Sequence, residues 1–179
     1  VTAVQLLEAG GTKALNDKTL PPDVRLELLH MLAELHDNLD LREAADRLAS
    51  EALKLAREVH GATSEKYVYA LVDWALTLPQ RGKARESDAA LLEAITLMEG
   101  NGLRHVESYP VALYQYGYNA NLSGNLPAAL TYLKRSVAAF EASHRDHSMR
   151  SIALRWLGNT YSVMEDFANA EIQHRASSV

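Results

Sequence analysis

Three Glu-x-x-His pairs are the residues in this sequence whose types and spacing could hold a metal ion: Glu27/His30, Glu141/His144 and Glu171/His174. On a helix this spacing puts carboxylate and imidazole on one face, and two such pairs facing two further glutamates hold a di-iron centre in helical bundles. The three pairs here belong to distant segments of the chain. We therefore interpret them as solvated helix-surface pairs, each stabilising a helix by about 0.2–0.5 kcal/mol. His144 and His147 share a connecting segment and could take up a metal only incidentally, so we expect no metal site.

Two further patterns could suggest catalysis. Gly10-Gly11-Thr12-Lys13 has the residue types of a phosphate-binding loop, but no strand is expected before it and the required glycine spacing is missing. Serine, histidine and aspartate all occur, yet nothing groups them into a nucleophile-elbow pattern. We expect no catalytic residue, no cofactor and no enzyme activity in this chain.

The amino-acid composition argues against several classes of binding partner. A formal net charge of −5 over 179 residues, with lysine and arginine scattered, argues against nucleic acid as a partner, because phosphate binding needs a concentrated basic surface. No apolar stretch approaches the ~20 residues that span a bilayer, so we expect no direct membrane insertion. The absence of cysteine excludes disulfides and thiolate metal sites.

Helical periodicity runs through the whole chain. Apolar residues recur at spacings of three and four, and no stretch has the period-two alternation of a strand. Proline and glycine separate the periodic segments. The expected helices cover about 4–15, 22–39, 41–60, 64–78, 84–99, 108–122, 127–143, 148–164 and 167–177. Gly10 and Gly11 interrupt the first of these. The sequence predicts an all-α protein of antiparallel helix pairs.

Small residues recur at one spacing. Ala33, Ala75 and Gly117 are 42 residues apart and Gly158 follows 41 later, each in a Leu-x-x-large-small pattern. Further small residues follow 12 positions on (Ala45, Ser87, Ala129, Ala170) and seven beyond those (Ala52, Ala94, Ser136, Ser177). A fixed period of this length is typical of a stacked repeat array, and small side chains are needed where two helices cross closely.

These residues resemble the tetratricopeptide repeat (TPR), in its lengthened form found in kinesin light chains and bacterial signalling proteins. Trp156-Leu157-Gly158-Asn159-Thr160-Tyr161 is the best match, and Gly82 and Gly124 stand at the turn, where Asp40 and Glu165 replace glycine in the other units. The resemblance implies one right-handed solenoid, an α-α superhelix, over 1–179. Its units are a leading partial unit at 4–20 and repeats at 22–61, 63–102, 106–144 and 148–179, the last truncated.

In this family the first helices of the repeats form a concave groove, and placing the chain on the repeat gives the candidate ligand-contacting residues. They are Glu27, His30, Glu34, Tyr69, Val72, Leu76, Tyr114, Tyr118, Asn121, Arg155 and Asn159. The tyrosines are the expected anchors; alternatively they pack as ordinary half-buried aromatics. The Lys/Asn/Arg clamp with which co-chaperone members bind a C-terminal carboxylate is absent. The acidic residues Glu27, Glu34 and Asp37 favour a basic or amphipathic ligand.

A narrower resemblance concerns the N-terminal stretch. Thr2 to Gly10 followed by Leu20-Pro21-Pro22-Asp23-Val24 is similar to the segment that leads into TPRs in bacterial serine/threonine protein kinases, although no kinase catalytic motif is present. The chain also begins without methionine and ends inside a helical pattern, so we expect a fragment of a larger protein. Its location would be cytoplasmic, or extracytoplasmic if the parent kinase spans a membrane.

Two functional hypotheses remain open at this point. The first is a non-catalytic protein–protein interaction module, the regulatory or scaffolding region of a larger bacterial signalling protein, which binds a peptide or partner domain in its groove. The alternative is a structural or oligomerisation element with no groove ligand. We also expect weak self-association through the fourth repeat, whose last helix has Ala170, Ile172 and Ser177 facing its own first helix and nothing to cover its other side.

Overall fold

The computed structural model describes residues 2–143 and 148–178, and within these ranges the chain is helical with no strand. The predicted all-α fold class is therefore confirmed. The chain divides into two compact units, Val1–Ala90 and Leu91–Val179, and each is described by itself. No helix in the described ranges is long and apolar enough to cross a membrane.

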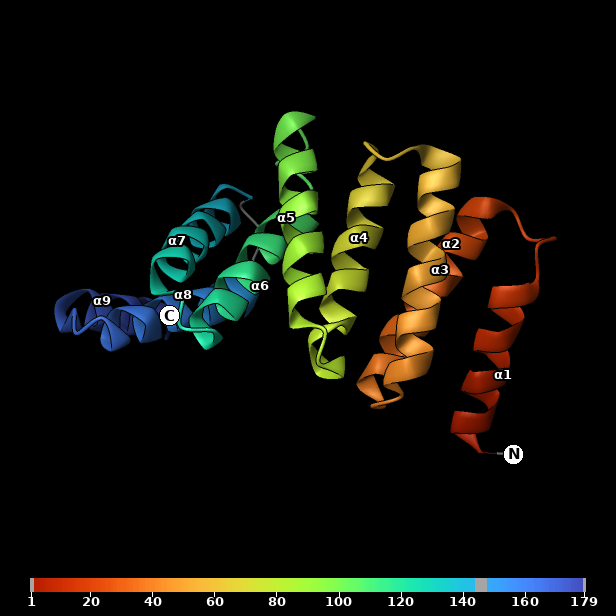
Figure 1. Cartoon of the computed structure of the whole chain (residues 1–179), viewed down its shortest axis with the longest axis horizontal. Helices are drawn as coiled ribbons and strands as arrows, with labels where there is room; N and C mark the ends of the chain where they lie inside the picture. Colours follow the sequence, from red (N-terminus) through yellow and green to blue (C-terminus); the bar gives the residue numbers. More distant parts are fainter. Residues whose placement is uncertain (1, 144–147, 179) are drawn as a thin grey trace. The chain divides into compact units, whose positions relative to one another are not determined.

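The first unit is built from helix pairs that pack side by side (Figure 1). Its elements are α1 (Ala3–Asn16), α2 (Pro22–Asn38), α3 (Arg42–His60), α4 (Glu65–Thr77), the short 3-10 helix η1 (Pro79–Arg81) and the start of α5 (Ala84–Gly100). Helix α2 packs mainly on α3, α3 packs on α4, and α1 packs on both α2 and α3.

Helix α1 differs from the sequence prediction in one respect. It continues through Gly10 and Gly11, which do not interrupt it. A Cβ atom at Gly11 would lie 3.2 Å from the His36 ring and 3.6 Å from Leu48. The glycines therefore allow α1 to approach α2 and α3 closely, and the packing offsets their low helix propensity.

The second unit repeats the same pairing. After the end of α5 come α6 (Ser108–Leu122), α7 (Leu126–Ala142), α8 (Ser148–Val163) and α9 (Phe167–Ser177). Helix α6 packs on α7, α7 on α8, and α8 on α9 (Figure 1). Its core is a cluster that includes the fully buried Leu133 and Phe140 together with Leu154, Leu157 and Tyr161.

Local chemistry sets the ends of the helices. The Ser64 hydroxyl accepts from the Tyr67 backbone N–H and so caps the N-terminus of α4. The four turns predicted between paired helices all use left-handed backbone at the glycine position of the repeat, with φ of 73° at Gly82 and 79° at Gly124, and 60° and 61° at Asp40 and Glu165. The two acidic residues thus adopt the conformation for which glycine is ordinarily used.

The small residues lie where the sequence placed them, at the helix crossings. Ala33 and Ala75 are buried, with 3% and 0% of their surface exposed. A Cβ atom at Gly117 would lie 2.8 Å from Leu133 Cγ and 3.0 Å from the Leu133 backbone nitrogen. At Gly158 it would meet the His174 ring at 2.8 Å. The α6–α7 crossing therefore leaves no room for a side chain at Gly117, whereas at Gly158 the His174 ring would have to shift to make room.

Candidate functional site

The first helices of the pairs (α2, α4, α6 and α8) carry all the predicted ligand-contacting residues. The two units supply separate sets of them. In the first unit they come from α2 and α4, and in the second from α6 and α8. We describe these two faces in turn.

In the first unit, a hydrogen bond joins α2 to α4. The Nδ1 atom of His30 lies 2.9 Å from Oδ2 of Asp73, and the Tyr69 ring meets the His30 ring edge-on at a centroid distance of 4.9 Å. Tyr69 keeps 48% of its surface exposed. His30 is thus fixed by two neighbours from α4, and it holds an aromatic ring at the surface beside a carboxylate.

Acidic side chains surround this contact. Glu27 precedes His30 along α2 and Glu34 and Asp37 follow it, all at helical spacing, and Glu27 and Glu34 are exposed. We call these three residues and Asp73 the acidic face. Burial raises the pKa of Asp37 above its usual value, the charges of Asp40 and Asp73 add to the rise, and Arg42 opposes it. A cation brought to this face would stabilise the ionised form of Asp37.

The other two residues predicted on α4 are less available. Val72 is buried with 3% exposed, and Leu76 is half-buried. Val72 therefore belongs to the buried packing rather than to an open surface. Leu76 can contribute an apolar edge beside Tyr69.

In the second unit, aromatic rings follow one another from α6 to α8. Tyr114 stacks on Tyr118 at a centroid distance of 6.0 Å, and Tyr118 meets Trp156 edge-on at 4.6 Å. The Asn121 side-chain N–H donates to Thr160 Oγ1 at 2.8 Å. Tyr114 is 9% exposed and belongs to the core cluster, and burial raises the pKa of its hydroxyl. Tyr114 is thus a packing residue, while Tyr118 is half-buried and reaches the surface.

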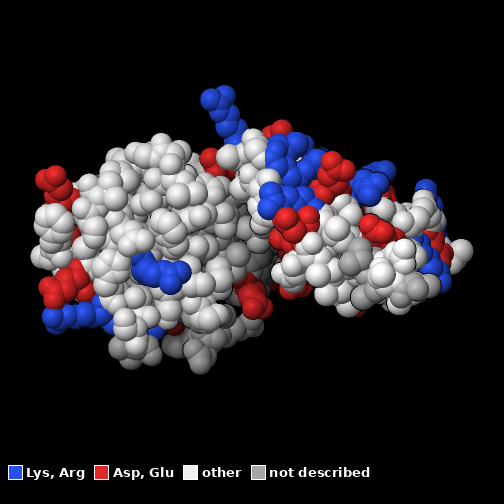
Figure 2. Space-filling view, turned by 90° about the horizontal axis from the view of Figure 1, so that it is seen from below, with Lys and Arg blue, Asp and Glu red and all other residues white. Residues whose placement is uncertain are grey.

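The surface of this second face is almost uncharged. Helix α6 contains no charged residue, and α8 contains only Arg150 and Arg155. Leu122 and Val163, at corresponding ends of α6 and α8, are 63% and 62% exposed. Arg155 is exposed and Asn159 half-buried on the same side of α8. Figure 2 shows white surface with few charged side chains over much of the part that holds these helices. The first unit thus offers acidic groups, and the second offers apolar and aromatic ones.

Sequence reasoning missed two residues of these faces, Asp73 as the partner of His30 and Trp156 as the partner of Tyr118. Each lies about one repeat length after its partner, at 43 and 38 residues. The repeat spacing could have suggested both pairs, because side chains one period apart lie on neighbouring first helices.

Residues of the Glu-x-x-His pairs contribute to helix packing and to ion pairs within the protein. The His174 ring lies beneath Gly158, and Glu171 pairs with Arg175. His30 is engaged by Asp73. The predictions for His144 and His147 fall outside the described residues. Within residues 2–143 and 148–178, no three histidine or acidic side chains gather as a metal site would require. The Gly10-Gly11-Thr12-Lys13 segment has the residue types of a phosphate-binding loop. In the structure it lies within helix α1 and forms no loop.

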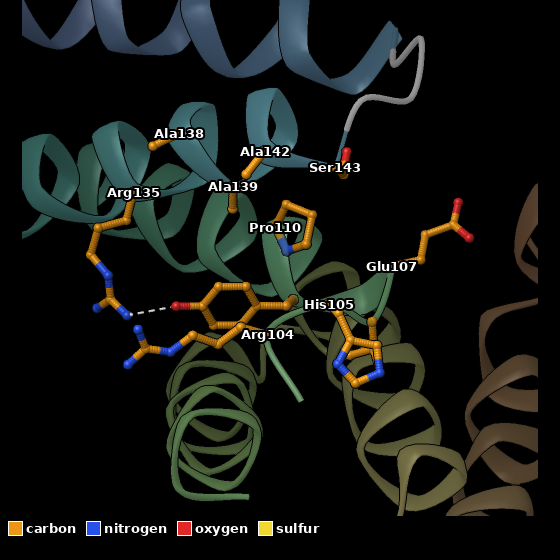
Figure 3. Close-up of a pocket in the computed structure, with 11 residues that line it drawn as sticks. Arg104, His105, Glu107, Pro110, Arg135, Ala138, Ala139, Ala142 and Ser143 are labelled. Atoms are coloured by element: carbon orange, nitrogen blue, oxygen red, sulfur yellow. Dashed lines mark hydrogen bonds between the residues drawn. The ribbon is translucent and has the colours of Figure 1, made fainter. Parts of the chain in front are cut away.

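The second unit also contains a hollow of about 700 Å³ (Figure 3). Its floor is formed by the small side chains Ala138, Ala139 and Ala142 of α7 with Pro110 of α6. Arg104 and Arg135 lie at one side, and Arg135 is engaged by Glu99 and by the Tyr109 hydroxyl. Glu99 thereby compensates the Arg135 charge within the protein.

Comparison with known proteins shows the fold. No family model and no curated protein matches the chain. Among solved structures, BtubC (BKLC) from P. vanneervenii matches at a TM-score of 0.80 and 20% identity, covering 98% of this chain and 70% of that one. A Podosopora anserina kinesin light chain-type protein with nearly identical TPR-like repeats matches at 0.73 and 17% identity, covering 98% and 84%. A Rap protein complexed with Competence and Sporulation Factor matches at 0.71 and 18% identity, covering 86% and 42%. The chain therefore has the TPR-like fold of these helical repeat proteins.

Proposed function

We propose that this chain is a non-catalytic protein–protein interaction module that binds a peptide or partner domain on the faces of its first helices. The observation that carries the proposal is Tyr69, an exposed aromatic ring fixed by His30 beside the acidic face. A rigid, exposed tyrosine supplies contact area with little conformational entropy to lose, and the carboxylates around it attract a positively charged partner.

Each face favours its own kind of ligand surface. The acidic face of the first unit would pair with the lysine or arginine side chains of a basic or amphipathic ligand. In the second unit, the exposed Leu122 and Val163 with Tyr118 would contact an apolar surface. Repeat arrays of this fold commonly use such extended surfaces for binding. The match to a Rap protein that was crystallised with Competence and Sporulation Factor supports a ligand-binding role for this fold.

Fluorescence anisotropy with a labelled amphipathic Leu/Lys helical peptide tests the proposal, with a Leu/Glu peptide of the same pattern as the matched control. We expect the Leu/Lys peptide alone to bind, and to bind more weakly as salt rises from about 0.05 to 0.5 M. Tyr69→Ala should weaken binding about tenfold or more, as expected for an aromatic hot spot. Phe167→Ala removes a 69% exposed ring from α9 and should leave binding unchanged. Equal binding of both peptides, or equal effects of the two alanine variants, would overturn the proposal.

The setting of the module is a further part of the proposal. The N-terminal stretch from Thr2 to Leu29 supports a regulatory region of a larger bacterial signalling protein, such as a serine/threonine protein kinase. The alternative function is a structural or oligomerisation element without a groove ligand. It is favoured by the exposed apolar side chains of α9, Phe167 and Ile172, which are 69% and 58% exposed. Persistent self-association of a Tyr69→Ala variant that binds neither peptide would support the alternative.

A further inference from the structure

The first unit contains a hollow of about 500 Å³ between three of its helices. One wall consists of α1 residues between Glu8 and Asn16, and the other of α3 residues between Ala44 and Leu48 (Figure 1). His36 of α2 also lines it. Both walls belong to helices that the structure describes, so the hollow is not an uncovered end of the helix array. Its volume lies in the range of small-molecule sites, about 300–1,000 Å³.

His36 brings a buried hydrogen-bond acceptor to this hollow. Its side chain is only 1% exposed, and its Nδ1 atom lies 2.6 Å from the Leu32 carbonyl oxygen. A carbonyl oxygen can only accept, so Nδ1 carries the proton and Nε2 keeps its lone pair. The Cε1–Nε2 edge of the ring lies against Gly11 of α1. Among residues 2–143 and 148–178, Nε2 has no hydrogen-bond partner, yet it is not sealed from solvent. A ligand in the hollow could therefore donate to it.

Two side chains of opposite charge line the same hollow without pairing. Glu8 of α1 and Arg47 of α3 lie on its two walls, and within the described part of the chain neither side chain makes an ion pair or a hydrogen bond. The nearest acidic residues along α3, Glu43 and Glu51, do not pair with Arg47, and Glu51 is bonded to Arg25 at 2.8 Å. The hollow thus offers separate positions for a cationic and an anionic group of one ligand.

Apolar side chains complete the lining. Leu48 of α3 is buried, while Leu15 of α1 and Ala44 of α3 are half-buried, and all three line the hollow. An apolar group placed against them would be removed from water, which is worth about 25 cal/mol per Å² of its surface. The hollow therefore combines an acceptor, a carboxylate, a guanidinium and an apolar wall.

We propose that this hollow binds a free α-amino acid with an apolar side chain, such as leucine. The ammonium group donates to His36 Nε2 and pairs with Glu8, the carboxylate pairs with Arg47, and the side chain lies against Leu15 and Leu48. A simple anion would leave Glu8 and His36 without a partner, and a simple cation would leave Arg47 without one. The site shares no residue with the acidic face, so it is independent of the peptide-binding function proposed above.

Isothermal titration calorimetry with the whole chain tests the class of ligand. We expect L-leucine to bind with a dissociation constant of about 1 mM or below. Three matched compounds each lack one feature of leucine: leucinamide the carboxylate, 4-methylpentanoate the ammonium group and glycine the apolar side chain. Each should bind about tenfold more weakly or worse. Equal binding of leucinamide would point to the N-terminus of a peptide as the ligand and would overturn the proposal.

Protein variants locate the ligand. Glu8→Gln and Arg47→Gln each remove one charge from one wall, and each should weaken leucine binding about tenfold or more. Both positions are exposed, so the variants should keep the melting temperature of the parent. Arg57→Gln is the control, because it removes the same charge from an exposed position of α3 that does not line the hollow. This variant should bind leucine as the parent does.

His36 has a readout of its own, which avoids replacing a buried residue. Long-range ¹H–¹⁵N spectra of the histidine rings should show His36 with its proton on Nδ1. Its Nε2 resonance should shift when leucine is added and stay in place when 4-methylpentanoate is added. The absence of leucine binding at millimolar concentrations, equal weakening by Arg47→Gln and Arg57→Gln, or an Nε2 resonance that leucine does not move would overturn the proposal.

Discussion

Arg25 and Tyr109 occupy the same repeat position and make the same connection between three helices, although one side chain is a cation and the other a phenol. Each donates to the preceding second helix, Arg25 to the Leu15 carbonyl and Tyr109 to Glu99, at 2.8 Å in both cases. Each also reaches the second helix of its own pair 26 residues later. Arg25 donates to Glu51 at 2.8 Å, and Tyr109 accepts from Arg135 at 3.3 Å. The repeat preserves the connection rather than the residue type.

Arg25→Ala should therefore loosen α1 and destabilise the first unit. Arg25 is only 6% exposed, and it also donates to the Ala14 carbonyl at 3.0 Å. Its loss leaves Glu51 and two carbonyl groups without their donor, at a cost of about 3 kcal/mol in unfolding free energy. Hydrogen exchange should speed up throughout α1. Arg42→Ala is the control, since the Arg42–Asp40 pair is largely exposed. This variant should lower the unfolding free energy by less than about 1 kcal/mol. A similar loss in both variants would contradict this role.

Gly117→Ala should destabilise the protein more than Gly158→Ala. The new Cβ at position 117 lies 3.0 Å from the Leu133 backbone nitrogen, which cannot move aside, whereas at position 158 it meets only the His174 ring. We expect a loss of about 1–3 kcal/mol at 117. Gly100→Ala is the control because nothing lies within 4 Å of its added Cβ, and it should be neutral or slightly stabilising. Chemical unfolding of the three variants measures this order, and equal losses would mean that the crossings are misplaced.

The helix ends, turns and crossings could be predicted from sequence because local chemistry fixes them. Pro22, Ser64 and Gly82 each have a backbone preference that holds in any surroundings. The exposure of Tyr114 could not be predicted in this way. Helix α6 has no charged residue to indicate its solvent side, so only the approach of α8 decides that Tyr114 is buried and Tyr118 half-buried. The prediction that Ile172 faces the first helix of its own repeat was wrong, because only the packing of α9 on α8 decides which of its residues are buried. Ala170 is buried, but Ile172 is 58% exposed and faces away from α8.

Asp37→Asn should stabilise the protein at neutral pH. Burial and the neighbouring Asp40 and Asp73 raise the pKa of Asp37 above 3.8, so the folded state binds its proton more tightly than the unfolded state does. This contribution to stability is present in full below pH 3.8 and is lost as pH rises through the folded-state pKa. The melting temperature of Asp37→Asn should exceed that of the parent at pH 7, and the difference should shrink toward pH 3.5.

Asp23→Asn should behave in the opposite way. Hydrogen bonds from Lys66 and His60 lower the pKa of Asp23 below 3.8. Its contribution to stability is therefore present above pH 3.8 and is lost as pH falls through the folded-state pKa. The variant should melt below the parent at pH 7 and approach it in acid. Melting curves of both variants across pH 3 to 7 test the pair, and shifts of the same sign would contradict the assignment.

Self-association through the fourth repeat should be weak and should depend on α9. Phe167 and Ile172 are 69% and 58% exposed, and Met164 just before the helix is 44% exposed. Burial of these apolar side chains in a symmetric contact with a second molecule would stabilise a dimer. Sedimentation velocity at rising concentration should show a shift toward a dimer, and Phe167→Ser with Ile172→Ser should abolish it. Leu39→Ser removes a comparably exposed apolar side chain from α2 and should leave the shift unchanged. A parent protein that stays monomeric at high concentration, or a loss of the dimer on Leu39→Ser, would rule out α9 as the contact, because the apolar area of α9 would then be insufficient or irrelevant.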